Sequence, residues 1–352
     1  MLRPKLGRTE FRRLTARAAL FVLMLVCGLA VEARAAAPLS IEEALTLLGY
    51  TTEQQRAIES GEIVVIDQAA LREDHLSAAV AMRLPVPVAA LRADALSGRN
   101  LQRDPHILVA TPLRNGPAAW QALSFGDSEG SEAARLLDYD GDDDFNLSTA
   151  EGARLPGGRA GGPRDASRPH VGISALYREI LMARHAAYQA EGLAAIAPYQ
   201  RNGLALYPDT GLAALSSSAN NALLQHFPDF AEALAAYPAA DTPGVSHGHF
   251  WLRREVDGRP LFILAHQVVA GGEGYLLFSM REYFVGHTYE ALQFFMLALP
   301  AEGGSVVLLV NNAFADKAAG FFSGLARWFG LGRMRDDLRS YFEALKAQAQ
   351  EF

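Results

Sequence analysis

Cysteine is almost absent from this sequence, which contains only Cys27 among its 352 residues. A single thiol cannot form an intrachain disulfide, so the fold has to be stable without one. Cys27 lies inside an apolar run near the N-terminus and follows Val26, where a lipoprotein cleavage site would need a small residue. We therefore predict no disulfides, no lipid attachment at Cys27 and no cysteine-based chemistry.

A long apolar run is also missing near the N-terminus. Residues 18–31 are apolar, but a run of about 14 residues is short for a membrane-spanning helix, which needs roughly 20. Six basic residues precede the run, and Ala33-Arg34-Ala35 follows it with small residues at both ends. This layout is typical of a cleaved secretory signal, with a retained membrane anchor as the alternative. We predict that residues 1–35 are a signal peptide, cut after Ala35 or Ala37, and that the remainder is periplasmic or secreted.

Positive charge is scarce as well. The chain has 32 Lys and Arg against 39 Asp and Glu, a formal net charge of −7. Loss of residues 1–35 would remove seven basic and two acidic residues and bring the charge to −12. An acidic chain of this kind is a poor partner for nucleic acid or for anionic lipid surfaces. We predict no nucleic-acid partner and no membrane-spanning segment in the mature chain, and contact with a membrane surface stays open as an alternative.

The clearest structural signal lies between residues 246 and 290. Asp257-Gly258 separates two strand-like runs, and an Asp-Gly pair in that position is typical of a tight β-hairpin. If these two residues form the turn, His249 lies directly opposite His266. The sequence therefore predicts a hairpin with imidazoles facing one another across it.

A Gly-rich break at residues 270–275 predicts a second hairpin, in which a regular turn sets His266 opposite Ser279 and Leu264 opposite Arg281. Because side chains alternate across a sheet, the two hairpins have one polar and aromatic face and one apolar face. The polar face carries His247, His249, Trp251, His266, Arg281, Tyr283 and His287. The apolar face carries Phe250, Leu252, Ile263, Ala265, Phe278, Met280 and Phe284.

The rest of the chain adds further strands and helices. Strand-like segments occur at residues 62–67, 76–86, 106–112, 291–299 and 305–310, and helical segments at 40–48, 52–60, 87–96, 173–197, 212–226 and 230–237. Residues 333–350 form an amphipathic helix whose apolar side we expect to pack on the apolar face of the sheet. We predict an α+β protein: one domain at residues 38–352, with a curved antiparallel sheet, a long C-terminal helix and a helical insertion at about 170–240.

Residues 140–151 have the spacing of an EF-hand calcium loop. The candidate ligands are Asp140, Asp142, Asp144, Asn146 and Glu151. Phe145 stands at the sixth position, where the sharp bend of such a loop requires glycine. The alternative is an acidic turn, a short strand and then a helix capped by Ser148.

The order of the elements resembles the helix-grip, START-like fold, in which a curved antiparallel sheet wraps a C-terminal helix and an apolar ligand occupies the gap. The chain also resembles, in short stretches of sequence, an uncharacterised family of exported bacterial proteins; these stretches are residues 141–148, 281–289 and 311–316. This resemblance covers about residues 60–345 and brings no activity with it. It implies a turn and strand, not a calcium loop, at 140–151. The helical block is larger than a plain START-like domain carries.

The polar sheet face has three interpretations. It could be a ligand pocket, with aromatic contact area and with Arg281 and imidazoles fixing a polar head group. It could hold zinc or copper through His247, His249 and His266. It could also be a polar face covered by the helical block, with hydrogen-bonded histidines. The predicted ligand-binding residues are His249, Trp251, His266, Arg281, Tyr283, His287 and Tyr289.

No nucleophile, zinc-protease or phosphate-loop motif is present, which favours a binding protein over an enzyme. The leading hypothesis is an exported, periplasmic binding protein for a lipid or other apolar small molecule with a polar head group. One alternative is a metal-dependent enzyme or metal carrier that uses the histidines. Another is a structural or interaction module of the cell envelope, docking a partner or membrane surface through residues 321–331.

Overall fold

The computed structural model describes residues 39–126, 129–141, 145–156, 169–201, 203–217, 221–239, 241–272, 274–315 and 323–352. The predicted signal peptide therefore lies outside the described residues. Residues 39–352 form one compact unit. None of the helices in the described ranges is both long and apolar enough to cross a membrane.

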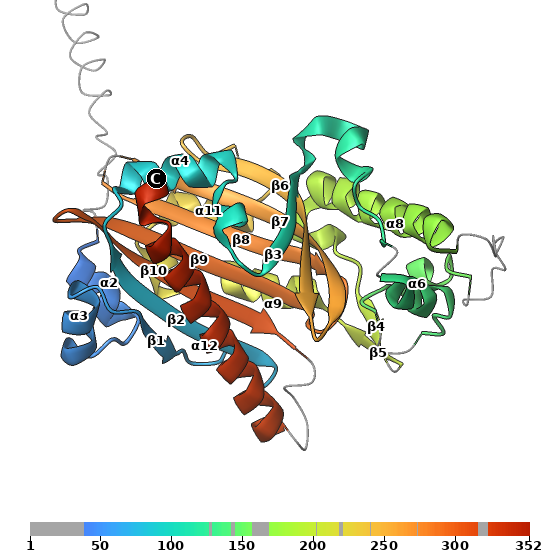
Figure 1. Cartoon of the computed structure of the whole chain (residues 1–352), viewed down its shortest axis with the longest axis horizontal. Helices are drawn as coiled ribbons and strands as arrows, with labels where there is room; N and C mark the ends of the chain where they lie inside the picture. Colours follow the sequence, from blue (N-terminus) through green and yellow to red (C-terminus); the bar gives the residue numbers. More distant parts are fainter. Residues whose placement is uncertain are drawn as a thin grey trace, which may run out of the picture. The chain divides into compact units, whose positions relative to one another are not determined.

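An antiparallel sheet of eight strands runs through the described chain (Figure 1). Its strand order is β1-β2-β10-β9-β8-β7-β6-β3. The strands are β1 (Val64–Asp67), β2 (His75–Leu84), β3 (Ile107–Pro112), β6 (Ser246–Val256), β7 (Arg259–Gly271), β8 (Leu276–Val285), β9 (Ala291–Ala301) and β10 (Gly304–Phe314). The predicted α+β class with a large antiparallel sheet is confirmed.

Helices cover both faces of this sheet (Figure 1). On one face lie α4 (Val88–Ser97), α5 (Asn100–Arg103) and α12 (Ser323–Ala347). The other face is covered by α6 (Gly130–Leu137), α8 (Pro169–Glu191), α9 (Pro208–Ser216), α10 (Ala222–Gln225) and α11 (Pro228–Ala235). Smaller elements are α2 (Ile41–Leu47), α3 (Thr52–Glu59), α7 (Thr149–Gly152), the hairpin β4–β5 (Tyr199–Arg201, Leu204–Leu206) and the 3-10 turns η1 (Leu113–Trp120), η3 (Gly192–Ala195) and η5 (Ala349–Glu351). The two faces have separate hydrophobic cores.

The first hairpin has the predicted register. His249 pairs with His266, and Asp257 and Gly258 both have positive φ, at 55° and 72°. Two consecutive residues in the left-handed region are what a two-residue type I′ turn requires. The Asp-Gly signal therefore fixed both the turn and the pairing of β6 with β7.

The second hairpin differs from the prediction. His266 pairs with Arg281 and Leu264 pairs with Phe284, because β7 continues to Gly271 and a bulge follows Leu264. A bulge inserts an extra residue and reverses the alternation beyond it. Tyr283 and Phe284 consequently both belong to the core under α8 and α9, and the prediction that Phe284 faces the other core is wrong.

The C-terminal helix packs as predicted, but it begins ten residues earlier. Met334, Leu338, Phe342 and Leu345 are buried, and the first three lie in the same core as β2 and β10. Residues 316–322 and the side chains of residues 323–329 lie outside the description, so the aromatic side chains of the predicted docking segment at 321–331 are not described. The predicted strand at residues 305–310 is too short, because β10 remains paired through Phe314.

The helical block also differs in detail. A continuous helix over residues 212–226 is wrong, because α9 ends at Ser216 and α10 begins at Ala222, where Asn221 accepts hydrogen bonds from Leu223 and Leu224. The hairpin β4–β5 and helix α6 were not predicted. All these elements lie on the face that carries most of the histidines.

Candidate functional site

Imidazole and phenol side chains pack together beneath α8 and α11. We call this group the imidazole cluster; its members are His185, Tyr188, Tyr237, His247, His249, His266 and Tyr283. Strands β6, β7 and β8 supply the side chains that the sequence placed on one face, and α8 supplies a histidine and a tyrosine. The predicted polar sheet face therefore exists, and the helical block covers it.

His266 is the centre of the cluster's hydrogen bonds. Its Nε2 lies 2.9 Å from His247 Nδ1, and its Nδ1 lies 2.9 Å from the Tyr188 hydroxyl. The Tyr237 hydroxyl lies 2.9 Å from His249 Nε2. Of the three interpretations of this face, the contacts match the covered polar face, although the partners are tyrosines and another histidine and not the backbone.

Burial keeps these imidazoles neutral. It lowers the pKa of His185 to about 4 and, with further repulsion from His185 and His247, the pKa of His249 to about 3. His266 is fully buried, and burial, His249 and Arg281 together lower its pKa well below the ordinary value. The cluster is thus a set of uncharged donors and acceptors at neutral pH.

Arg281 lies deeper, next to the cluster. Its guanidinium donates to the Tyr188 hydroxyl at 3.0 Å, to Ser216 Oγ at 2.6 Å and to the Leu234 carbonyl at 2.9 Å. Within the described chain it forms no ion pair with a carboxylate. Both of its terminal nitrogens donate to protein oxygens, so this arginine ties α8, α9 and α11 to β8, while its Nε has no partner among the described residues.

The remaining predicted site residues lie elsewhere. The Trp251 indole donates to the Ala119 carbonyl at 2.8 Å and packs against η1. His287 lies beyond the bulge, with its Nε2 3.1 Å from the Pro260 carbonyl and 4.0 Å from Glu132. Tyr289 lies on the opposite face of the sheet. The structure therefore brings together four of the seven predicted residues: His249, His266, Arg281 and Tyr283.

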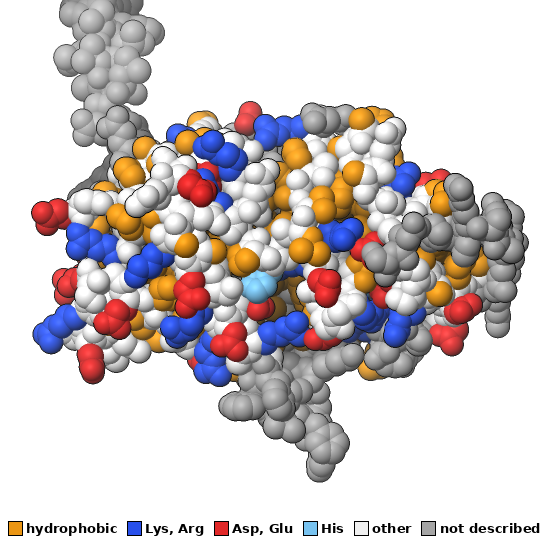
Figure 2. Space-filling model, in the orientation of Figure 1, with side chains coloured by type: hydrophobic (Ala, Val, Ile, Leu, Met, Phe, Trp, Pro, Cys, Tyr) orange, Lys and Arg blue, Asp and Glu red, His pale blue; other side chains and the backbone are white. Residues whose placement is uncertain are grey.

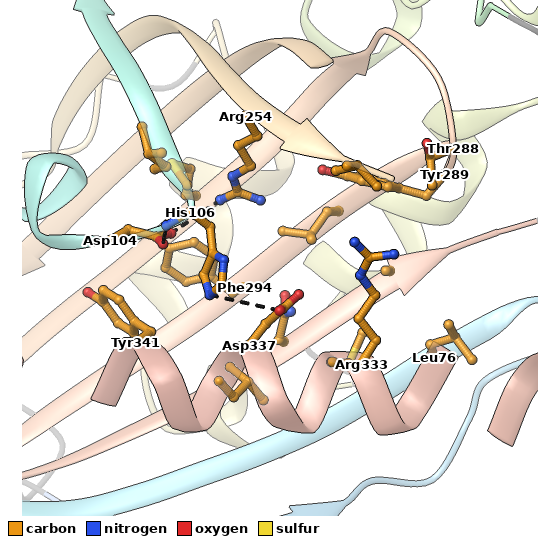
Figure 3. A pocket seen from close by; sticks show the side chains of 18 of the residues that line it. Leu76, Asp104, His106, Arg254, Thr288, Tyr289, Phe294, Arg333, Asp337 and Tyr341 are labelled. Atoms are coloured by element: carbon orange, nitrogen blue, oxygen red, sulfur yellow. Dashed lines mark hydrogen bonds and ion pairs between the residues drawn. The ribbon is translucent and has the colours of Figure 1, made fainter. Parts of the chain in front are cut away.

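A cavity of about 420 Å³ lies on that opposite face, between the sheet and α12 (Figure 3). Its wall is mostly apolar and comes from α12, β2, β3 and the strands β6 and β8 to β10. Apolar lining residues include Leu76, Ile107, Met280, Leu292, Phe294, Leu309, Ala313, Met334 and Leu338. We expected the space beside the imidazoles; it lies against α12 instead, because the helical block fills the imidazole face with aromatic rings.

The deep polar wall of this cavity is an ion pair. Arg254 Nη1 lies 3.2 Å from Glu282 Oε1, and the Tyr289 hydroxyl donates to Glu282 Oε2 at 2.6 Å. Glu282 is completely buried, and burial raises its pKa although Arg254 and Tyr289 oppose the shift. Arg254 and Tyr289 both line the cavity, so they separate the buried carboxylate from it.

Charged side chains border the cavity on the side of α12 and β3. Figure 3 shows His106, Arg254 and Asp337 directed into one space, with Arg333 and Tyr341 on either side of Asp337 along α12. His106 Nε2 lies 3.8 Å from the Asp337 carboxylate. Figure 2 shows the same face of the molecule, where acidic, basic and apolar side chains surround an imidazole. The cavity thus combines apolar walls with a charged border, which is the usual make-up of a small-molecule site.

The predicted calcium loop is only partly described, since residues 142–144 lie outside the described ranges and Asp142 and Asp144 are among them. Asn146 is fully buried, and its side-chain amide donates to the carbonyls of Val285 and Tyr289 at 2.8 and 2.7 Å. Glu151 caps α7 together with Ser148 and forms an ion pair with Arg184. These contacts agree with the capped helix of the alternative interpretation, whereas the predicted short strand is wrong, because residues 145–148 belong to no strand.

Metal binding was the other interpretation of the histidines. In the part of the chain that the structure describes, no group of three or more His, Cys, Asp or Glu side chains is arranged to hold a metal ion. In the imidazole cluster, three of the four histidines are already within hydrogen-bond distance of a tyrosine.

The polar residues of the cavity were missed in the sequence. Strand alternation places Arg254 on the same face as Leu252, and Glu282 on the same face as Met280. Two opposite charges on an otherwise apolar face were a signal for a buried ion pair. The alternation of side chains along the strands was enough to show this signal, whereas the position of Asp337, which comes from α12, could not be predicted in that way.

Comparisons with known proteins add little to this description. No family model and no curated protein matches the chain. Among solved structures, Ara h 8.0201 is 14% identical with a TM-score of 0.23, covering 32% of this chain and 71% of its own. TTHA0849 from Thermus thermophilus is 13% identical with a TM-score of 0.24, covering 40% of this chain and 89% of its own. Scores this low define neither the fold nor a function.

Proposed function

We propose that this protein is an exported, periplasmic binding protein for an apolar small molecule with a polar head group, and that the ligand occupies the cavity beneath α12. The observation that carries the proposal is the cavity itself, about 420 Å³ with largely apolar walls. Ligand pockets of proteins typically measure about 300–1,000 Å³ and combine such walls with a few polar groups. In this proposal the sheet and α12 form a helix-grip arrangement.

The polar wall supports a ligand with two chemically different ends. Arg254, held by Glu282, and the hydroxyl of Tyr289 lie among apolar side chains. The Arg254 Nε has no hydrogen-bond partner among the described residues. A buried donor of this kind costs free energy unless a ligand or water accepts from it. We infer that an oxygen atom of the ligand, or water bound with the ligand, supplies that acceptor.

The test uses an uncharged dye and a cavity-filling variant. Nile red should bind the wild-type protein with saturable fluorescence enhancement, because its rings need only apolar contacts. Ala313→Phe places a ring in the cavity from β10 and should weaken dye binding by about tenfold or more. Ala347→Phe, at an exposed position near the end of α12, should leave binding unchanged. Equal binding by wild type and Ala313→Phe, or no saturable binding by either, would refute the proposal.

A second measurement needs no variant. Native mass spectrometry of the protein purified from its own host should show a bound apolar molecule that is lost on denaturation. N-terminal sequencing of the same material should begin at residue 36 or 38 if the signal is cut as predicted. An intact first residue would refute export by a cleaved signal without touching the binding proposal.

A further inference from the structure

Both arginines that line the cavity already have carboxylate partners. Arg254 lies 3.2 Å from Glu282 and 3.5 Å from Asp104. Arg333 Nη1 lies 2.7 Å from Asp257 Oδ1, at the tip of the first hairpin. Two partners for the first cation and one for the second leave little positive charge to attract an anionic ligand.

Asp337 is in the opposite situation. Within the described chain no hydrogen bond reaches its carboxylate, and its nearest partner is His106 Nε2 at 3.8 Å. Partial burial raises the pKa of Asp337, although His106, Arg333 and Arg254 oppose the shift. Its side chain is 52% exposed, so a ligand entering from solvent can reach it.

Aromatic rings lie close to this carboxylate. Tyr341 stands one helical turn after Asp337 on α12, and Phe294 from β9 lies across the cavity (Figure 3). A carboxylate together with ring faces is the combination that holds ammonium and quaternary ammonium groups, because the ring quadrupole attracts a cation. The negative face of an aromatic ring would repel a carboxylate or phosphate in the same place.

We propose that the ligand is a cationic amphiphile, whose ammonium group lies at Asp337 between Tyr341 and His106 and whose apolar chain extends beneath α12. This inference rests on the proposed function, since it assigns the chemical class of the ligand for the same cavity. The apolar chain would lie against Leu309 and Leu338, and a polar substituent along it would reach Arg254.

Three amphiphiles of equal chain length test the sign of the head group. Decyltrimethylammonium, decanol and decanoate compete with Nile red at neutral pH and low salt, each below its micelle concentration. We expect the ammonium compound to bind at least about tenfold more tightly than decanoate, with decanol between them. Decanoate equal to or tighter than the ammonium compound would overturn the cationic assignment while leaving the cavity a binding site. Failure of all three compounds and of Nile red would overturn the proposed function itself.

A matched pair of variants locates the charge. Asp337→Asn keeps the shape of the side chain, and the described chain gives this carboxylate no hydrogen bond to lose, so folding is preserved. It should weaken decyltrimethylammonium binding by about tenfold and leave decanol unchanged. Asp336→Asn removes the same charge one residue away, outside the cavity lining, and should leave both unchanged. Equal effects of the two substitutions on the ammonium compound would overturn the assignment of Asp337 as its partner.

Discussion

Acid should destabilise this protein through the imidazole cluster, and the size of the effect follows from burial. An imidazole that titrates at pH 6.5 in the unfolded chain stays neutral in the folded protein down to about pH 4 at His185 and about pH 3 at His249. Below pH 6.5 the unfolded state therefore binds protons that the folded state does not. The stability is complete above pH 6.5 and falls as the pH falls toward the folded pKa values.

Below pH 6.5 the unfolding free energy falls by about 1.4 kcal/mol per pH unit for each such histidine. Between neutrality and pH 5 this amounts to about 2 kcal/mol each, or at most about 6 kcal/mol for His185, His249 and His266 together. Domains are typically stable by only about 5–15 kcal/mol, so the loss is decisive. Arg281 is one of the groups that keep His266 neutral at pH 5, because it repels a proton there, and its effect is already included in this maximum.

The assay is urea unfolding followed by tryptophan fluorescence at pH 7.5 and pH 5.0. His249→Gln should reduce the difference in unfolding free energy between the two pH values by about 2 kcal/mol, whatever it does to stability at pH 7.5. His226→Gln, at an exposed position, should leave the difference unchanged. A wild-type protein equally stable at both pH values, or an unaltered difference in His249→Gln, would refute the view that these imidazoles are buried and neutral.

Three further substitutions test the fold and the cavity wall by the same unfolding measurement. Glu282→Gln replaces the nearer of the two carboxylates beside Arg254 with a neutral amide and should cost up to about 3 kcal/mol. Glu255→Gln, at an exposed position on the same hairpin, is the control, and a change below about 1 kcal/mol in Glu282→Gln would argue against the ion pair. Asp257→Val should cost about 1–2 kcal/mol, because a branched side chain is strained at a φ of 55°. Asp257→Asn should cost less than half of that, and equal losses would attribute the effect to the ion pair with Arg333. Gly304→Ala should cost about 2 kcal/mol or more, since a Cβ there collides with the Leu84 carbonyl. Gly130→Ala, with open space around it, should be neutral or stabilising. A larger loss of stability in Gly130→Ala than in Gly304→Ala would contradict the packing of β10 on β2.

Local chemistry made much of the sheet predictable. Asp257-Gly258 determines a two-residue turn, and a turn of known length determines which residues oppose one another. The second loop carried no such signal, so the prediction missed the true pairing by two residues. An error of two keeps the side chains between the loop and the bulge on their predicted face, and this is why His266 and Arg281 still meet.

Tertiary organisation was not predictable in the same way. The bulge after Leu264 cannot be read from alternation, and it moved Phe284 and His287 away from their predicted positions. Whether the histidine face or the apolar face would retain an open space depended on how well each helical layer fills its side. Helix α12 brings polar Arg333 and Asp337 to the sheet, whereas α8 brings Tyr188, whose ring stacks 3.9 Å from that of Tyr283.

The position of α12 in the chain has a consequence for how the protein is made. Every strand of the sheet precedes this helix in the sequence, and Leu338 and Phe342 cover side chains on that side of the sheet. The apolar side of the sheet therefore stays uncovered until α12 has been synthesised and packs on it. The cavity therefore exists only once α12 has packed on the strands, so a ligand cannot be enclosed before this helix is in place.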